Sequence, residues 1–536
     1  MSRSNVQFLS AILLALLVAL TGCTAAQAPA AQEATAAPAV VEQEVTRVVE
    51  VTATPAPAAQ AKYVFLFIGD GMAVAQRNAA ELYLAATAGT GDRPEDTTLL
   101  MNTFPAQGMN TTYDLTSVIP DSASTATAIA SGHKTASGVV GMNPDGSESF
   151  KTISEYAKEN GWKVGVISSV SLDHATPAAF YAHETSRKNM YSISMQLANS
   201  GFDYFAGGAL LKPTNADDPT QPSAIDTAVA NGYTVVTDRA AFESLTADSG
   251  PVLAMCSAVD GDAALYYELD RAENDLALAD YVAKGIELLD NPEGFFLVVE
   301  GGKIDWACHA NDAAASIHDT LAFDAAIAEA VAFYEQHPDE TLIIVTGDHE
   351  TGGMTIGYAG TQYNSFVDKI QYQTMSYIEF DKALDEYKGT HTAETASFED
   401  MLPLIESAFG LKVISAEDRA ALEAKAEEGD AEAEAELGMV LSDLELEALQ
   451  AAFIETMKGE EVRSTDEHTY LMYGGYEPFS IKLTTILNQK SGIAWTSYSH
   501  TGVPVQTSAL GVGAESFNGY YDQTDIFSKM MTIAGF

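Results

Sequence analysis

The sequence is short of basic residues and of cysteines, and each shortage excludes a class of protein. Only 27 Lys and Arg stand against 75 Asp and Glu among 536 residues, which gives a formal net charge of −48 at pH 7. A field of this sign repels nucleic acid, so we expect no nucleic-acid partner, and an anionic substrate would need local cations or an Arg to hold it. Beyond Cys23 there are only Cys256 and Cys308, too few for a disulfide framework, and we expect free thiols.

The N-terminus has the layout of a secretory leader followed by a tether. Residues 1–23 contain Arg3, an apolar run too short to span a bilayer comfortably, and the ending Leu-Thr-Gly-Cys, which resembles a bacterial lipobox. These features predict a lipoprotein signal peptide over 1–23, lipidation of Cys23 and a disordered Ala/Pro/Thr tether over 24–61. The protein would then be extracytoplasmic and held at the membrane by an N-terminal lipid anchor. A plain secretory signal with an incidental Cys23 is the alternative.

After the tether, apolar runs of strand length alternate with segments of helical composition. The runs lie at residues 61–68, 163–168, 294–300 and 341–346, with helical stretches such as 275–289 and 313–334 between them. This alternation predicts an α/β fold, a three-layer α/β/α arrangement around a mainly parallel central sheet. Ligands of such sheets bind beyond the carboxyl ends of the strands.

Five potential metal ligands lie at or just after the ends of apolar runs: Asp70, Glu300, Asp305, Asp348 and His349. Carboxylate and imidazole together suit zinc, and a carboxylate beside a buried run is costly to ionise without a cation. Each motif alone also fits a turn or a surface pair. It is their convergence on one sheet edge that predicts a metal site.

A second ligand pair and two further polar motifs extend the set. Asp305 and His309 are four residues apart, so on a helix they share one face and can bind one ion. The stretch around His174 and Thr176 is followed by Arg187, whose planar fork matches phosphate oxygens. A surface arginine is the alternative reading of Arg187.

The nucleophile is predicted in the run Pro-Asp-Ser-Ala-Ser-Thr-Ala-Thr-Ala-Ile-Ala at residues 120–130. Pro120 and Asp121 suit a turn and a helix N-cap, and the Ala-rich remainder suits a helix, so Ser122 would stand at a helix N-terminus. There the unpaired N–H groups and the helix dipole favour an alkoxide or a phosphate. The alternative is an ordinary Ser-rich helix start.

The pattern changes between residues 365 and 490. This stretch contains acidic, Ala-rich sequence at 416–436 and an amphipathic stretch at 437–457, and we interpret it as an inserted acidic helical cap. The prediction is a catalytic domain made of residues 62–364 and 491–536, interrupted by this helical cap.

Taken together, the motifs resemble the alkaline phosphatases. The matching pieces are Gly-Asp70-Gly-Met, Pro-Asp-Ser122-Ala-Ser-Thr-Ala, His174-Ala-Thr176-Pro, His-Glu-Thr-Ser-Arg187, Val-Glu300-Gly-Gly-Lys-Ile-Asp305, His309, Thr-Gly-Asp348-His349-Glu-Thr-Gly-Gly and His500-Thr-Gly. The resemblance implies a sheet of roughly ten strands, two zinc ions and a third site that usually holds magnesium.

The resemblance also assigns the ligands. It implies a first zinc on Asp305, His309 and His500, a second on Asp70, Asp348, His349 and the Ser122 oxygen, and a third ion on Asp70, His174, Thr176 and Glu300. Because imidazole is softer than carboxylate, His174 leaves magnesium or zinc open at the third site. Asp121 resembles the residue that orients the phosphate-binding Arg187, and Trp306 occupies a variable position of the family.

The implied activity is metal-dependent hydrolysis of small phosphate monoesters through a phosphoserine at Ser122, with Arg187 helping to bind the phosphate. Homodimers are common in the family, so a homodimer is an expected state. Two alternatives stay open at this point: a phosphodiesterase of the same metal-hydrolase superfamily, and a non-catalytic solute-binding lipoprotein.

Overall fold

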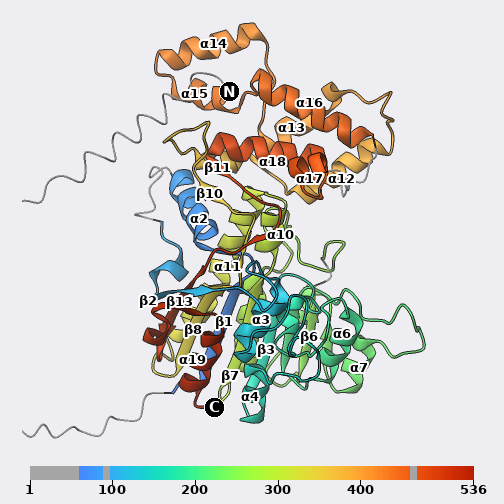
Figure 1. Cartoon of the computed structure of the whole chain (residues 1–536), viewed down its shortest axis with the longest axis vertical. Coiled ribbons are helices and arrows are strands. Elements are labelled where there is room, and N and C mark those ends of the chain that lie inside the picture. The colour runs from blue at the N-terminus through green and yellow to red at the C-terminus, as the bar shows by residue number, and fades with distance from the viewer. Residues whose placement is uncertain (1–59, 89–96, 257, 459–466) are drawn as a thin grey trace, which may run out of the picture. The chain divides into compact units, whose positions relative to one another are not determined.

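The structure is a computed structural model that describes residues 60–88, 97–256, 258–458 and 467–536 (Figure 1). The predicted signal peptide, the lipidation site Cys23 and almost all of the predicted tether lie outside the described residues. Within the described part of the chain, no helix is long and apolar enough to cross a membrane. Residues 58–536 form one compact unit.

A ten-stranded sheet organises this unit. In spatial order its strands are β14 (Gly519–Asp522), β2 (Ala106–Thr111), β13 (Val505–Gly511), β8 (Thr341–Gly347), β1 (Tyr63–Gly69), β7 (Phe295–Gly301), β3 (Lys163–Ser168), β4 (Tyr204–Gly207), β6 (Val252–Met255) and β5 (Thr234–Val236). All neighbouring pairs are parallel except those of β13, which runs antiparallel to β2 and β8. The predicted fold class is confirmed, and the four predicted apolar runs form β1, β3, β7 and β8.

The sheet is covered on both faces, which explains why its central strands are apolar at every position. In β1, Phe65 and Phe67 face one hydrophobic core, whereas Leu66 and Ile68 face the other. The first core is closed by α2 (Val74–Thr87), α9 (Leu278–Leu289), α10 (Lys303–His309) and α11 (Ala313–Tyr334). The second is closed by α3 (Ser122–Ser131), α4 (Ile153–Glu159), α5 (Ala175–Ala178), α6 (Met190–Asn199), α7 (Ala224–Ala230) and α19 (Thr524–Ala534).

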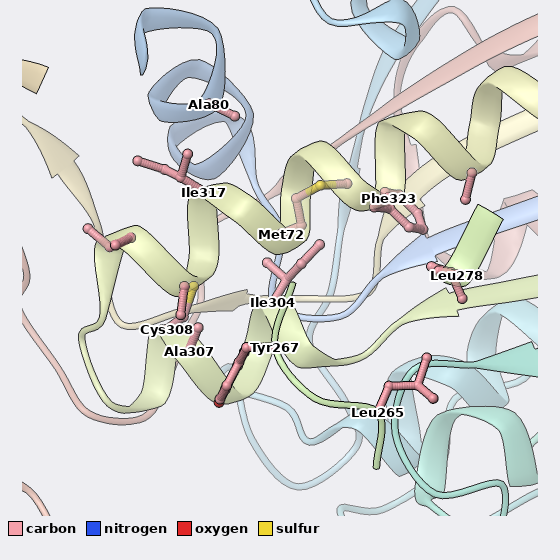
Figure 2. Close-up of a cluster of buried hydrophobic side chains, with 14 of the residues drawn as sticks. Met72, Ala80, Leu265, Tyr267, Leu278, Ile304, Ala307, Cys308, Ile317 and Phe323 are labelled. Atoms are coloured by element: carbon pink, nitrogen blue, oxygen red, sulfur yellow. The ribbon is translucent and has the colours of Figure 1, made fainter. Parts of the chain in front are cut away.

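Figure 2 shows part of the first core, where α10 and α11 pack beneath α2. Ile304 and Cys308 of α10 lie near Ile317 and Phe323 of α11, and all four are fully buried. Cys308 is a free thiol within this packing, and Cys256 is also free, as predicted. Helix α10, which carries two predicted metal ligands, is therefore fixed by its apolar face.

Helices occupy most of residues 365–490. They are η3 (Val367–Tyr372), α12 (Tyr377–Lys388), η4 (Phe398–Met401), α13 (Leu402–Phe409), α14 (Ala416–Glu427), α15 (Ala431–Met439), α16 (Asp443–Met457), α17 (Glu467–Tyr473) and α18 (Pro478–Ser491). The amphipathic stretch 437–457 is not one helix. The Ser442 hydroxyl accepts the Glu445 N–H while the Glu445 carboxylate accepts the Ser442 N–H, and this capping box starts α16 afresh.

The helical cap continues the first core rather than forming a separate one. Its buried Phe380 and Phe479 belong to the same hydrophobic cluster as β1 and α11. Polar contacts also join it to the turn before α11: Gln373 Nε2 donates to Asp312 Oδ1 at 2.9 Å, and Asn488 Nδ2 donates to the Asn311 carbonyl at 2.7 Å. The limits of the cap at residues 365 and 490 stay predictions.

Candidate active site

Strand register brings the acidic residues to one edge of the sheet. Ile68 of β1 is paired with Glu300 of β7, and Gly69 of β1 is paired with Gly347 of β8. Asp70 and Asp348 each follow directly after these strands, so both lie at the carboxyl edge next to Glu300. All three carboxylates are buried. The parallel register thus gathers these carboxylates at one edge, where the sequence predicted them.

One ligand group consists of Asp305, His309 and His500. Their candidate ligand atoms lie within 4.8 Å of one another, and His309 Nε2 is 3.4 Å from Asp305 Oδ2. Each histidine is held through its other ring nitrogen: His309 Nδ1 donates to the Tyr498 carbonyl and His500 Nδ1 to the Pro120 carbonyl, both at 2.7 Å. These contacts direct both Nε2 atoms toward Asp305, the arrangement of metal-binding histidines.

Two further groups share Asp70. The first is Asp70, Asp348 and His349, in which His349 Nε2 lies 3.2 Å from Asp70 Oδ1 and 3.3 Å from Asp348 Oδ2. The second is Asp70, His174 and Glu300, again with ligand atoms within 4.8 Å. Since Asp70 belongs to both groups, it can bridge two ions.

The buried carboxylates of these two groups repel one another. Among the described residues, no N–H or O–H group hydrogen-bonds either oxygen of the fully buried Asp70. Burial, followed by the charges of nearby carboxylates such as Asp348, raises the pKa of Asp70 well above its usual value. Burial likewise raises the pKa of Glu300 to about 8 and that of Asp348 to about 7. A divalent cation would offset this repulsion, and the mixed carboxylate and imidazole donors suit zinc.

The remaining carboxylate, Asp305, behaves differently because three imidazoles surround it. Burial would raise the pKa of Asp305, but the neighbouring His309, His500 and His349 hold it well below its usual value. The pKa of His309 responds in the opposite direction. Burial would lower it, yet Asp305 raises it to about 9. In this group the negative charge of Asp305 is therefore balanced by the imidazole of His309.

Ser122 is the first residue of α3, at the edge where the ligand groups meet. Asp121 has extended backbone dihedrals and caps the helix by accepting the Ser124 N–H at 3.1 Å. Ser122 Oγ lies 3.2 Å from His349 Nε2, so the hydroxyl borders the second ligand group. The predicted position of Ser122 at a helix N-terminus is what the structure shows.

Arg187 lies beside this serine rather than at a distant surface. Its Nη1 donates to Asp121 Oδ2 and its Nη2 to His174 Nε2, both at 3.0 Å. Burial, and then the Arg187 charge, lower the pKa of His174 to about 3, so the ring is neutral. A neutral ring that accepts at Nε2 carries its proton on Nδ1. In this arrangement the His174 ring accepts a hydrogen bond from Arg187, and the proton on Nδ1 blocks that nitrogen from binding a cation. His174 can bind a cation through Nδ1 only if Arg187 turns away or the ring reorients.

Sequence reasoning missed several residues that support the site. Thr125 Oγ1 donates to Asp348 Oδ2 at 3.0 Å, Thr351 Oγ1 donates to Asp305 Oδ1, and Gln523 Nε2 donates to the Asp348 carbonyl at 2.7 Å. Thr125 and Thr351 lie within the motifs that carry the predicted site, where Thr125 falls one helical turn after Asp121. Nothing in the local sequence distinguishes Gln523.

Thr176, another predicted ligand, lies on α5 and is buried, and its hydroxyl has no hydrogen-bond partner among the described residues. Glu300 Oε2 accepts a hydrogen bond from Ser168 Oγ at the end of β3. All predicted ligands are thus gathered at one edge of the sheet. A cavity of about 740 Å³ opens over it and is lined by Ser122, Arg187, His174, Asp305, His309 and His500, among others.

Comparison of the sequence with known proteins gives a consistent result. The model of the family described as alkaline phosphatase matches residues 61–205 and 215–428. Alkaline phosphatase 3 of Bacillus subtilis (strain 168) is 29% identical over 476 residues, which cover 87% of each chain. The human tissue-nonspecific alkaline phosphatase is 32% identical over 341 residues, covering 54% of this chain and 63% of the human protein.

Solved structures agree at the level of the fold. The cold-active alkaline phosphatase from the psychrophile Shewanella sp. superimposes with a TM-score of 0.67 at 28% identity, covering 88% of this chain and 99% of that one. The Thermus thermophilus alkaline phosphatase gives a TM-score of 0.66 at 24% identity, with 89% and 92% covered. A variant of the alkaline phosphatase from the Antarctic bacterium TAB5, at 23% identity and a TM-score of 0.57 with 89% and 99% covered, has Mg bound in its M3 site.

Proposed function

Since this chain belongs to the alkaline phosphatase family and is a metal-binding phosphatase, we propose that it hydrolyses phosphate monoesters through a phosphoserine on Ser122. The observation that carries the proposal is the position of Ser122. Its hydroxyl lies at a helix N-terminus, 3.2 Å from the ligand histidine His349, with Arg187 held nearby by Asp121. Nucleophile, anion-binding group and ligand groups are thereby within reach of one phosphate.

The proposal assigns an ion to each ligand group. A first zinc would be held by Asp305, His309 and His500, and a second by Asp70, Asp348 and His349. The third ion would be held by Asp70, Glu300, Thr176 and, after the change of partner described above, His174. This ion is magnesium or zinc, since a histidine stands where a carboxylate would select magnesium more strongly. When bound, the metal ions supply Lewis acidity that lowers the pKa of the serine hydroxyl and neutralises phosphate charge.

The chain's own groups carry out the remaining steps. Arg187 binds phosphate oxygens with its fork, and the N–H groups at the start of α3 offset negative charge near the attacking oxygen. Ser122 Oγ gives its proton to solvent and forms a bond to phosphorus while the bond from phosphorus to the ester oxygen breaks, and the leaving oxygen takes a proton from solvent to depart as the alcohol. Water then attacks the phosphoserine, which releases inorganic phosphate and restores the serine hydroxyl.

The location of the protein is also a proposal and rests on sequence alone. We propose that Cys23 is lipidated and that residues 24–61 tether the enzyme to the outer side of the membrane. Replacing Cys23 with Ala should move activity from the membrane fraction to the soluble fraction of a bacterial host. An unchanged distribution would refute the anchor. A homodimer stays a prediction, which light scattering of the purified protein can check.

The central test uses p-nitrophenyl phosphate hydrolysis between pH 7 and 10, with bis(p-nitrophenyl) phosphate as the diester control. Wild-type protein loaded with zinc and magnesium should hydrolyse the monoester faster than the diester, and rapid acid quenching should trap phosphate on Ser122. The Ser122→Ala protein should lose turnover and labelling yet still bind inorganic phosphate. Faster diester cleavage, or full activity without Ser122, would overturn the proposal.

A further inference from the structure

The cavity over Ser122 is far larger than a phosphate group needs. Its volume of about 740 Å³ falls in the range of sites that enclose whole small molecules. Ser122 and Arg187, the proposed phosphate-binding residues, form only a small part of its lining, and the rest comes from elsewhere in the chain. The unoccupied part must therefore receive the leaving group of the ester, so its lining determines which esters fit.

With the predicted ligands also set aside, half of the remaining lining residues are aromatic. Five aromatic side chains line the cavity, and we call them the aromatic wall: Trp306, Tyr377, Tyr470, Tyr476 and Tyr498. Three of them, Tyr377, Tyr470 and Tyr476, belong to the helical cap, whereas Trp306 lies on α10 and Tyr498 lies two residues before His500. The helical cap thus contributes side chains directly to the lining of the cavity.

Neighbouring rings fix the wall in place. The Tyr377 and Tyr476 ring centroids are 5.7 Å apart with perpendicular planes, and those of Tyr476 and Tyr498 are 6.4 Å apart. The Tyr498 hydroxyl donates to the Met472 carbonyl at 2.9 Å. Edge-to-face contacts of this kind are favourable and directional. Tyr377, Tyr476 and Tyr498 are consequently held before any ligand arrives, which reduces the entropy lost on binding.

The ring of Trp306 also contacts a buried positive charge, that of Lys303. Lys303 Nζ lies 4.7 Å from the Trp306 ring and forms an ion pair with Asp260 at 2.6 Å. A lysine over an indole face is a favourable cation–π contact. The Trp306 ring is therefore oriented by α10, the helix that also carries Asp305 and His309.

The aromatic wall lies next to the ligand group of Asp305, His309 and His500, whereas Ser122 borders the group of Asp70, Asp348 and His349. Trp306 follows Asp305 in sequence, and the Tyr498 carbonyl accepts a hydrogen bond from His309 Nδ1. Beyond the ligand groups and Arg187, the charged side chain among the described residues lining the cavity is Asp262, an anion. A leaving group placed here meets rings and a carboxylate, which favours a neutral planar group and disfavours a second phosphate.

On the basis of the proposed function, we propose that the aromatic wall is a leaving-group subsite for a neutral planar ring. The ring could be the base of a nucleoside monophosphate or a simple aryl group, because both present a flat π-face to aromatic side chains. Tyr470 and Tyr476 would be the specificity-determining residues, since they line the cavity from the helical cap, a part of the chain that carries none of the predicted metal ligands.

The test compares substrates that differ only in the ring. Adenosine 5′-monophosphate and ribose 5-phosphate share the same primary ester, and benzyl phosphate and cyclohexylmethyl phosphate differ in planarity at similar bulk. Stacking of one base on aromatic side chains should raise kcat/KM for the nucleotide over ribose 5-phosphate by about 5- to 150-fold. The ratio should fall to about threefold or less in a Tyr470→Ala, Tyr476→Ala double variant and be retained in the double Phe variant.

Controls separate failure of this inference from failure of the proposed function. Tyr363, which is fully exposed and outside the cavity, provides the matched variant Tyr363→Ala, which should keep the ratio. Calorimetry on the Ser122→Ala protein gives the same ratio as binding constants, so the inference is tested even if no ester is turned over. A preference in one substrate pair alone would identify the source of the ring. Equal values within both pairs, or an unchanged ratio in a folded double Ala variant, would overturn the subsite.

Discussion

Replacing Asp121 with Asn separates two tasks that this side chain performs. Oδ1 accepts the backbone N–H groups of Ser124 and Gly138, at 3.1 and 2.9 Å, whereas Oδ2 accepts from Arg187 at 3.0 Å. An amide has a single oxygen. If that oxygen keeps the two backbone contacts, the NH₂ group faces the guanidinium, and a donor meets a donor. The helix cap is then retained and the Arg187 contact is lost.

The expected loss follows from the freedom that Arg187 regains. In Asp121→Asn the contact with His174 is the one hydrogen bond from the described residues that the guanidinium keeps, so its side chain must be ordered again when phosphate binds. Ordering a long side chain costs about 1–2 kcal/mol. Phosphate binding should therefore weaken by about 5- to 30-fold. Stability should change by less than about 1 kcal/mol, because a cap residue of equal quality remains.

The effect should be constant across the alkaline range. Burial would raise the pKa of Asp121, but the Arg187 charge and the N–H groups of Gly138 and Ser124 hold it below its usual value. The side chain is thus ionised in the wild-type protein from pH 7 to 10. Competitive inhibition by inorganic phosphate at several pH values measures the loss, and urea unfolding measures stability.

Asp121→Ala is the matched control, since it removes the cap as well as the Arg187 contact. Its free energy of unfolding should fall by about 1 kcal/mol relative to Asp121→Asn. An inhibition constant for phosphate that stays within twofold of wild type in Asp121→Asn would refute the reasoning, because Arg187 would then be oriented by other groups.

Three further outcomes are expected. Chelation should abolish activity and lower the melting temperature, because no cation then offsets the repulsion among the buried carboxylates of Asp70, Asp348 and Glu300; activity assays and calorimetry before and after zinc is restored measure the two effects, and an unchanged melting temperature would argue against a cation at Asp70. Asp381→Asn should raise the melting temperature by a few degrees at pH 9 but not at pH 5. Burial raises the pKa of Asp381 to about 8, so the stability of the wild-type protein declines as pH rises from 3.8 to about 8; equal shifts at both pH values would contradict this. Phe479→Ala should cost about 3–5 kcal/mol in urea unfolding, because Phe479 is fully buried against Phe380 and Phe453, and a loss below 1 kcal/mol would show that the helical cap collapses around the cavity.

The central strands and most ligands were predictable because their signals are local. A strand buried on both faces must be apolar at every position, so the runs that form β1, β3, β7 and β8 are visible without knowledge of their neighbours. Parallel pairing then brings the residues after each strand to the same edge. Asp70 and Asp348 could be placed together on this ground alone, although 278 residues separate them.

Features that depend on pairing between distant segments could not be predicted in the same way. The antiparallel direction of β13 is set by its contacts with β2 and β8, and its sequence carries no mark of it. The break between α15 and α16 was missed for a different reason. The apolar spacing continues across it, and only the capping pair Ser442 and Glu445 marks the new start. The aromatic wall combines one tryptophan and four tyrosines from around residues 306, 377, 470–476 and 498, so no single stretch indicates a pocket.

One short segment connects the aromatic wall to the chemistry. The Tyr498 carbonyl orients His309, and His500 orients itself by donating to the carbonyl of Pro120, directly before the cap residue of α3. His500 also pairs with Thr351 across the two-stranded sheet of β12 (His500–Thr501) and β9 (Glu350–Thr351). Any displacement of this segment would therefore move a wall ring and two predicted ligands together. Tyr470 and Tyr476 come from the helical cap, which carries none of the predicted ligands, so substitutions there can change which leaving group binds without removing a ligand. We expect the specificity of this site to be adjustable at the helical cap and its rate to be sensitive at residues 498–501.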